Sequence, residues 1–172
     1  MKKVYLDMDI LSAFAKRDMP EATLNALIQL LQFAKAHKIG LFTSDVHRTE
    51  IERYGGSLLT DRTRWNLEVV YLLAENVQFI EAQRLLGINV YWDRFGTCTN
   101  SPMIENHPTW TKCRALSLSE IDAHHLMVAI EAKCDVFLTC DKRTILNRRT
   151  EIEREFSTIK LMEPQELVAA LS

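Results

Sequence analysis

The sequence predicts a three-layer α/β/α fold, in which helices cover both faces of a central, mostly parallel sheet. Short apolar strands alternate with amphipathic helices along most of the chain, which is the pattern of parallel strands joined by crossover helices. The chain has 172 residues and is 47% hydrophobic, enough for one proper core. We therefore expect a single domain over residues 1–172.

The first third of the chain predicts two strands, each followed by a helix. The apolar segment Lys2–Leu6 reads as a buried strand closed by the charge of Asp7. A helix follows directly, and a second begins at Pro20 with apolar residues at helical spacing. We expect Gly40 to end that helix as a left-handed cap and to lead into a strand over residues 40–44.

The middle of the chain is harder to assign. Helices are predicted over residues 45–54 and 58–75, and residues 77–80 fit either a strand or an extended connector. From about residue 87 to residue 116 no periodic pattern is visible, and such a long loop is usually functional or interfacial. We treat residues 55–116 as an atypical insertion of helix and loop.

Aromatic residues of this insertion alternate with basic ones, and two interpretations remain open. The rings either pin the insertion to the domain as a small second core, or stack on unpaired bases. Exposed rings would also favour a homodimer. The aromatic residues are Tyr91, Trp92, Phe95 and Trp110, and the basic ones are Arg94, Lys112 and Arg114.

The last third of the chain returns to a clear α/β pattern. Ser119 is a good N-cap for a helix, with Asp122 in its first turn. A strand over residues 135–139 then leads to Asp141. A charged helix, a strand over residues 157–162 and a helix that starts at Pro164 complete the chain.

Charge and composition exclude several classes of protein. A formal net charge of −2 argues against non-specific coating of nucleic acid, although a local basic rim stays compatible with it. Asp7 and Asp9 interrupt any signal-peptide core, and no apolar run approaches the roughly 20 residues that span a bilayer. The four cysteines form no CxxC pair, which argues against structural zinc. We expect a cytoplasmic protein without a membrane segment.

Four acidic residues are expected at one edge of the sheet. Asp7 and Asp141 end strands, Asp122 opens a helix, and an acid from the segment after the second strand would join them. Spacing does not decide whether that acid is Glu50, Glu52 or Asp45. Clustered carboxylates repel one another unless a cation is present, and oxygen ligands favour Mg²⁺ or Mn²⁺. Such ions activate water for hydrolysis of phosphodiesters.

Two other groups of residues contain side chains of the kind that bind metal ions or phosphates. His124 and His125 follow Asp122, but neighbouring positions on a helix point about 100° apart and make a poor chelate. We expect one histidine to pack and the other to face solvent. The basic residues after Asp141 could contact RNA phosphates or could form an ordinary solvated face. They are Lys142, Arg143, Arg148 and Arg149, with Arg48 earlier in the chain.

Several segments together resemble the PIN domain, the nuclease fold of VapC-type toxins and of many RNA-processing enzymes. They are VYLDMDIL, TSDVHRTEIER, IDAHHLMVAIEAKCDVFLTCDKRTIL and IKLMEPQELVAAL, about two thirds of the chain. The resemblance matches Asp7, Glu50, Asp122 and Asp141 to the four acidic positions of the family. It implies a metal-dependent ribonuclease that uses Mg²⁺ or Mn²⁺, with these four residues as catalytic metal ligands.

The sequence departs from the family pattern at three places. Asp9 stands where Asn or Ser is usual, and it either adds a metal ligand or caps the following helix. Cys140 replaces a polar residue next to Asp141, and the insertion at residues 55–116 is longer than in compact toxins. These departures leave open the RNA target, the oligomeric state and the presence of an antitoxin partner.

Two alternatives to the ribonuclease hypothesis come from the same residues. A non-catalytic PIN-like module that binds RNA or a protein would explain the departures at Asp9 and Cys140. The Asp7–Met8–Asp9 spacing also fits a Mg²⁺-dependent phosphatase of the haloacid-dehalogenase kind, but the other signatures of that class are absent.

Overall fold

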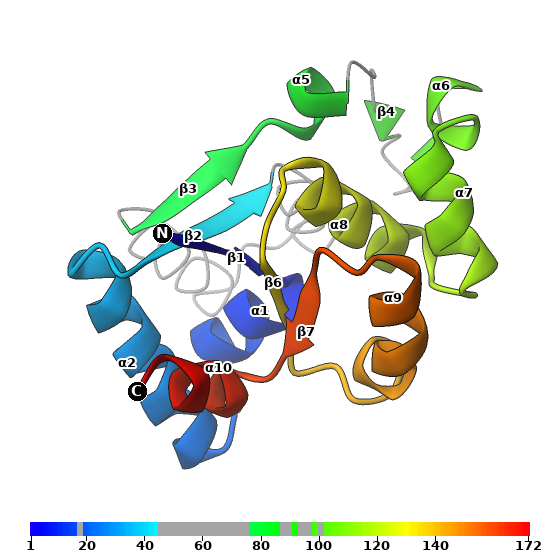
Figure 1. Ribbon diagram of the computed structural model, residues 1–172. Coiled ribbons are helices and arrows are strands. Elements are labelled where there is room, and N and C mark those ends of the chain that lie inside the picture. Colours follow the sequence, from blue (N-terminus) through cyan, green and yellow to red (C-terminus); the bar gives the residue numbers. More distant parts are fainter. Residues whose placement is uncertain (17–18, 45–75, 87–90, 93–97, 100–101) are drawn as a thin grey trace, which may run out of the picture.

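A computed structural model describes residues 1–16, 19–44, 76–86, 91–92, 98–99 and 102–172. The predicted helices over residues 45–54 and 58–75, with Asp45, Arg48, Glu50, Glu52, Arg94 and Phe95, lie outside these ranges. In the described part, five parallel strands form one sheet in the order β3-β2-β1-β6-β7 (Figure 1). They are β1 (Lys2–Leu6), β2 (Ile39–Ser44), β3 (Val77–Ile80), β6 (Val136–Leu138) and β7 (Lys160–Met162).

Helices cover both faces of this sheet, so the predicted three-layer α/β/α architecture is confirmed. One face packs against α1 (Met8–Lys16), α2 (Glu21–Lys35) and α10 (Pro164–Leu171). On the other side lie α5 (Ala82–Leu86), α8 (Glu120–Glu131) and α9 (Arg149–Glu155), and α7 (Pro108–Ala115) packs on the outer side of α8 beside α6 (Pro102–Glu105). A 3-10 turn, η1 (Leu146–Arg148), precedes α9, and β4 (Tyr91–Trp92) pairs antiparallel with β5 (Cys98–Thr99).

The strand period of two explains why the sheet separates two hydrophobic cores. In β1, Val4 and Leu6 face the α1/α2 layer, whereas Tyr5 faces the α8 layer. In β6 the same alternation places Phe137 on the α8 side, where its ring is fully buried. Burying one such ring stabilises the fold by about 1.5–3 kcal/mol.

The long segment predicted as a loop contains two helices, so that expectation is wrong for residues 102–115. Proline stands at the start of both α6 and α7, where its missing N–H costs no hydrogen bond. Trp110 of α7 is buried and packs against His124 of α8, with ring centroids 4.7 Å apart. For Trp110 the small-core interpretation is therefore correct, and its ring is not available to a base.

Helix α8 is buried on all sides because it lies between the sheet and α7. Every residue from Ala123 to Ala129 is buried, and this includes both His124 and His125. The expectation that one histidine faces solvent is therefore wrong. Burial lowers the pKa of His124 to about 4 and that of His125 to about 3, so both rings are neutral at neutral pH.

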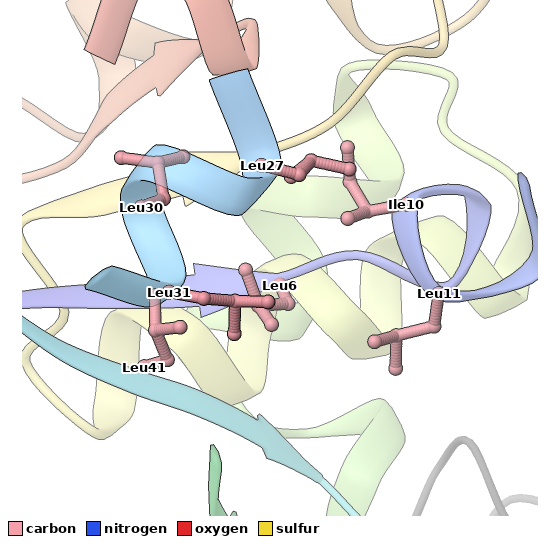
Figure 2. A pocket seen from close by; sticks show the side chains of 7 residues that line it. All are labelled: Leu6, Ile10, Leu11, Leu27, Leu30, Leu31 and Leu41. Carbon is pink, nitrogen blue, oxygen red and sulfur yellow. The ribbon is translucent and has the colours of Figure 1, made fainter. Parts of the chain in front are cut away.

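An apolar pocket lies between α1, α2 and the sheet, with a volume of about 20 Å³ (Figure 2). It is lined by Leu6, Ile10, Leu11, Leu27, Leu30, Leu31 and Leu41. These side chains offer no hydrogen-bond donor, acceptor or charge, so the pocket has no chemistry of its own.

Helix α2 ends at Lys35, earlier than predicted, and Gly40 is not its cap. His37 adopts the left-handed conformation with φ 56°, its N–H bonds to Ala34, and the N–H of Lys38 bonds to Phe33. This pair of hydrogen bonds is the Schellman motif, with His37 where glycine is usual. Gly40 lies instead in β2, where a Cβ would come within 2.9 Å of the Phe42 ring.

Replacing His37 by glycine should therefore stabilise the protein. The left-handed backbone costs a non-glycine residue about 1–2 kcal/mol, and glycine avoids this cost. Part of the gain is offset, because glycine has more conformational freedom to lose on folding. We expect His37→Gly to raise the free energy of unfolding by about 0.5–1 kcal/mol, measured by urea denaturation. His37→Ala keeps the strain and should show no gain, and equal stability of the two variants would contradict the argument.

Candidate active site

The candidate site lies where the strand order of the sheet reverses. From β1 the chain proceeds outward to β2 and β3, then crosses back to place β6 and β7 on the opposite side of β1. The reversal point therefore lies between the carboxyl ends of β1 and β6, which is where open α/β sheets place their ligands. Asp7 follows β1, and Thr139, Cys140 and Asp141 follow β6.

Asp7 is held at this point by hydrogen bonds to the end of β6. Its backbone N–H donates to the Leu138 carbonyl over 3.0 Å, so the strand pairing continues into the site. Its side chain is 6% exposed and accepts hydrogen bonds from the N–H of Met8 and the hydroxyl of Thr139, both at 2.8 Å. Burial, together with the charge of Asp9, raises the pKa of Asp7 well above its usual value.

Asp9, at the start of α1, points to the same strand end. One carboxylate oxygen accepts a hydrogen bond from the Cys140 N–H at 2.6 Å and lies 3.2 Å from the Thr139 hydroxyl, whose single proton is shared with the nearer Asp7 carboxylate. The other oxygen, Oδ1, is buried and has no hydrogen-bond partner among the described residues. Burial is the main cause that raises the pKa of Asp9 to about 6. Asp9 lies inside α1, which begins at Met8, and its side chain bonds to the end of β6.

Thr139 joins the two carboxylates, and the site residues predicted from the sequence do not include it. Its hydroxyl contacts Asp7 and Asp9 and also accepts a hydrogen bond from the N–H of Asp141 at 3.1 Å. The side chain is completely buried. Its position two residues before Asp141, at the end of an apolar strand, was the available signal.

Asp141 lies beside the site, but its side chain organises its own turn. Its carboxylate accepts hydrogen bonds from the backbone N–H groups of Arg143 and Thr144, at 2.8 and 3.0 Å, and from the Thr144 hydroxyl. Burial alone would raise the pKa of Asp141, but these hydrogen bonds outweigh it and lower the pKa. The residue is thus an anion at neutral pH, and its charge helps to raise the pKa of Asp9. This turn also delays the predicted charged helix, which begins only at η1 and α9.

Asp122 reaches the site from α8. Its backbone N–H bonds to the Ser119 hydroxyl at 3.1 Å, which confirms Ser119 as the N-cap. Its charge is among the causes that raise the pKa of Asp7, so the two carboxylates are close enough to interact. The structure thus gathers Asp7, Asp9, Asp122 and Asp141 in one region, and Glu50 lies outside the described residues.

The donor set fits a hard divalent cation in part. Asp7 and Asp9 supply oxygen ligands only, and the buried Oδ1 atom of Asp9 has no hydrogen-bond partner among the described residues. Within the described ranges, however, no three His, Cys, Asp or Glu side chains are already arranged to hold a metal. The role of these acids as ligands stays a prediction, with Glu50 as the remaining donor expected from the sequence.

Most basic residues after Asp141 are engaged in ion pairs. Arg149 forms two hydrogen bonds to Glu166, at 2.8 and 2.7 Å, and Lys142 pairs with Glu163 at 2.9 Å. Arg148 approaches Glu151 at 3.5 Å. These contacts favour the interpretation as a solvated helix face over a preformed phosphate site.

This parallel sheet, with aspartates near its reversal point, is similar in fold to two solved structures. The chain is similar to VapBC2 from Rickettsia felis bound to a DNA fragment from their promoter, with 13% identity and a TM-score of 0.55. That match covers 94% of this chain and 98% of the other. The expected VapC-type PIN fold is confirmed by this match and by a second one.

The second match is to DNA-bound VapBC from Salmonella typhimurium, with 14% identity and a TM-score of 0.55. It covers 95% of this chain and 99% of the other. No family model and no curated protein sequence matches the chain, so the likeness is one of fold. None of the described helices is long and apolar enough to cross a membrane.

The burial of Asp9 predicts how stability depends on pH. Because its pKa is higher in the folded protein than the ordinary value of about 4, its contribution to stability is present below pH 4 and is lost as pH rises through 6. Asp9→Asn keeps the oxygen that accepts from Cys140 and removes the charge. In the absence of divalent ions, this variant should be more stable than the wild type above pH 6, by on the order of 1–3 kcal/mol.

Urea denaturation between pH 4 and pH 8 in the presence of EDTA measures this difference. The two proteins should converge near pH 4. Glu151→Gln, at an exposed position, is the matched control and should follow the wild type at every pH. A destabilised Asp9→Asn protein at pH 8 would contradict the assignment of a buried charge.

Proposed function

We propose that the protein is a metal-dependent endoribonuclease that hydrolyses RNA phosphodiester bonds with Mg²⁺ or Mn²⁺. The observation that carries this proposal is that buried Asp7 and half-buried Asp9 both lie at the Thr139 hydroxyl, at the reversal point of the sheet. Two carboxylates about 4 Å apart repel by roughly 4 kcal/mol at an effective dielectric constant of 20. Among the described residues no hydrogen bond or ion pair joins either carboxylate to a lysine or arginine, which supports a site for a bound cation.

Each acidic residue has a distinct part in this proposal. Asp7 and Asp9 would hold the cation from β1 and α1, and Thr139 keeps both carboxylates in place through its hydroxyl. Asp122 and Asp141 add negative charge to the site, and Glu50 is the further expected ligand. A bound Mg²⁺ or Mn²⁺ would supply activation of water and neutralisation of the phosphate charge.

We further propose that the protein acts as the toxin of a toxin–antitoxin pair. Similarity in fold to chains of VapBC complexes supports this, and an antitoxin protein would then be the partner. A homodimer is part of the same proposal. Co-purification of the chain with the protein encoded by a neighbouring small gene would test the pairing. A chain that stays monomeric and cleaves RNA at the same rate in the presence of that protein would contradict it.

Cleavage of RNA with Mn²⁺ tests the enzymatic proposal. Asp7→Asn and Asp141→Asn should each lower the rate by about 100-fold or more, because loss of an outer partner alone typically costs 10–100-fold. Glu151→Gln is the surface control and should retain the wild-type rate. Equal rates for all four proteins would refute catalysis by this site.

Metal binding can be measured separately from cleavage. Mn²⁺ at 100 times its dissociation constant should stabilise the wild type by about 2.7 kcal/mol, because only the folded state holds the site. The rise in melting temperature that Mn²⁺ causes should be absent in Asp7→Asn, and EDTA should reverse it in the wild type. A wild type that binds RNA but shows no shift would favour the alternative of a non-catalytic PIN-like binding module.

A further inference from the structure

Tyr5 carries a buried hydroxyl that the proposed chemistry does not use. It lies in β1 and is completely buried on the α8 side of the sheet. The hydroxyl lies 2.7 Å from the Ser44 hydroxyl and 2.8 Å from Nδ1 of His125. All three side chains are at most 1% exposed, so water cannot replace a missing partner.

The three groups form a neutral chain of hydrogen bonds. Burial holds the imidazole of His125 in its neutral form, as its low pKa shows. A neutral imidazole nitrogen either donates or accepts, and the Tyr5 hydroxyl has one proton. The hydroxyl therefore donates to one neighbour and accepts from the other, and its removal takes one hydrogen bond from each of two buried polar groups.

Each group in this chain belongs to a segment that leads to the acidic site. Tyr5 lies two residues before Asp7, and His125 lies three residues after Asp122 on α8, on the same side of the helix. Ser44 is the last residue of β2. The hydroxyl of Tyr5 thus adds a side-chain link between β1, its paired strand β2 and α8.

The ring of Tyr5 reaches the fourth segment. It stacks on Phe137 of β6, with centroids 5.4 Å apart and an interplanar angle of 15°. Phe137 lies two residues before Thr139, which bonds to Asp7 and Asp9. Packing of the ring and bonding of the hydroxyl are therefore separable contributions.

We propose that Tyr5 is a positioning residue, whose hydroxyl ties Ser44 and His125 together and so holds Asp122 against Asp7 in the geometry that binds a divalent cation. This inference rests on the proposed function, because it concerns the same metal site. It assigns a role in that site to Tyr5, Ser44 and His125, none of which would touch the metal.

Removal of the hydroxyl alone is the direct test. Tyr5→Phe keeps the ring on Phe137, and Thr43→Val is the matched control, because it removes a buried hydroxyl from the neighbouring residue of β2. By calorimetric titration with Mn²⁺, we expect Tyr5→Phe to weaken binding about tenfold, as loss of an outer partner of a metal site does. The Mn²⁺ affinity of Thr43→Val should stay within twofold of that of the wild type. A Tyr5→Phe protein whose Mn²⁺ affinity is also within twofold of the wild type would overturn the proposal.

Two substitutions of His125 separate bonding from packing. His125→Asn retains a polar group near the position of Nδ1, whereas His125→Leu fills more of the volume without one. A positioning role predicts that Asn keeps Mn²⁺ affinity closer to the wild type than Leu does. The reverse order would show that the histidine acts through packing alone and would overturn the proposal.

A readout without metal keeps this test independent of the proposed function. A wild type that does not bind Mn²⁺ would refute the metal site itself. In that case the backbone amide resonances of Asp7 and Asp122 report on position directly. They should shift in Tyr5→Phe and not in Thr43→Val, and unchanged resonances in both variants would overturn the positioning role.

Discussion

Parallel pairing of β1 with β6 is the constraint on which the rest of the site depends. The two strands are separated by about 130 residues of sequence, yet the N–H of Asp7 bonds to the carbonyl of Leu138. That one register places the side chain of Asp7 beside the hydroxyl of Thr139 and the backbone of Cys140 beside Asp9. A slip by one residue would turn Thr139 to the other face of the sheet.

The same pairing forces the protein to bury carboxylates of like charge. Folding removes Asp7 and Asp9 from water, which raises both pKa values; the charge of Asp9 raises the pKa of Asp7 further, and the charge of Asp141 raises that of Asp9. An interior that served stability alone would hold apolar or neutral residues there. Asp141 shows the contrasting solution, because its own turn supplies enough hydrogen bonds to keep it charged. Folding therefore disfavours the charged forms of Asp7 and Asp9, whereas hydrogen bonds stabilise the charged form of Asp141.

Much of the fold was predictable because strands and helices with clear periodicity can be recognised from a few neighbouring residues. β1 matches its predicted bounds, and Ser119 caps α8 as expected. The errors arose where tertiary packing decides. His37 replaces Gly40 as the end of α2, α6 and α7 occupy a segment without visible period, and both histidines of α8 are buried. No local pattern could show that α7 covers the outer side of α8.

The sequence by itself determined the strand-ending acids, the helix cap and the order of the elements, because each depends on neighbours within a few residues. Only the tertiary structure decided which of those acids share one region, that Asp9 and Thr139 belong to it, and that Tyr5 lies behind it. These contacts join β1, β2, α8 and β6, and their distances follow from strand order and register. Neither the strand order nor the register follows from the spacing of residues along the chain.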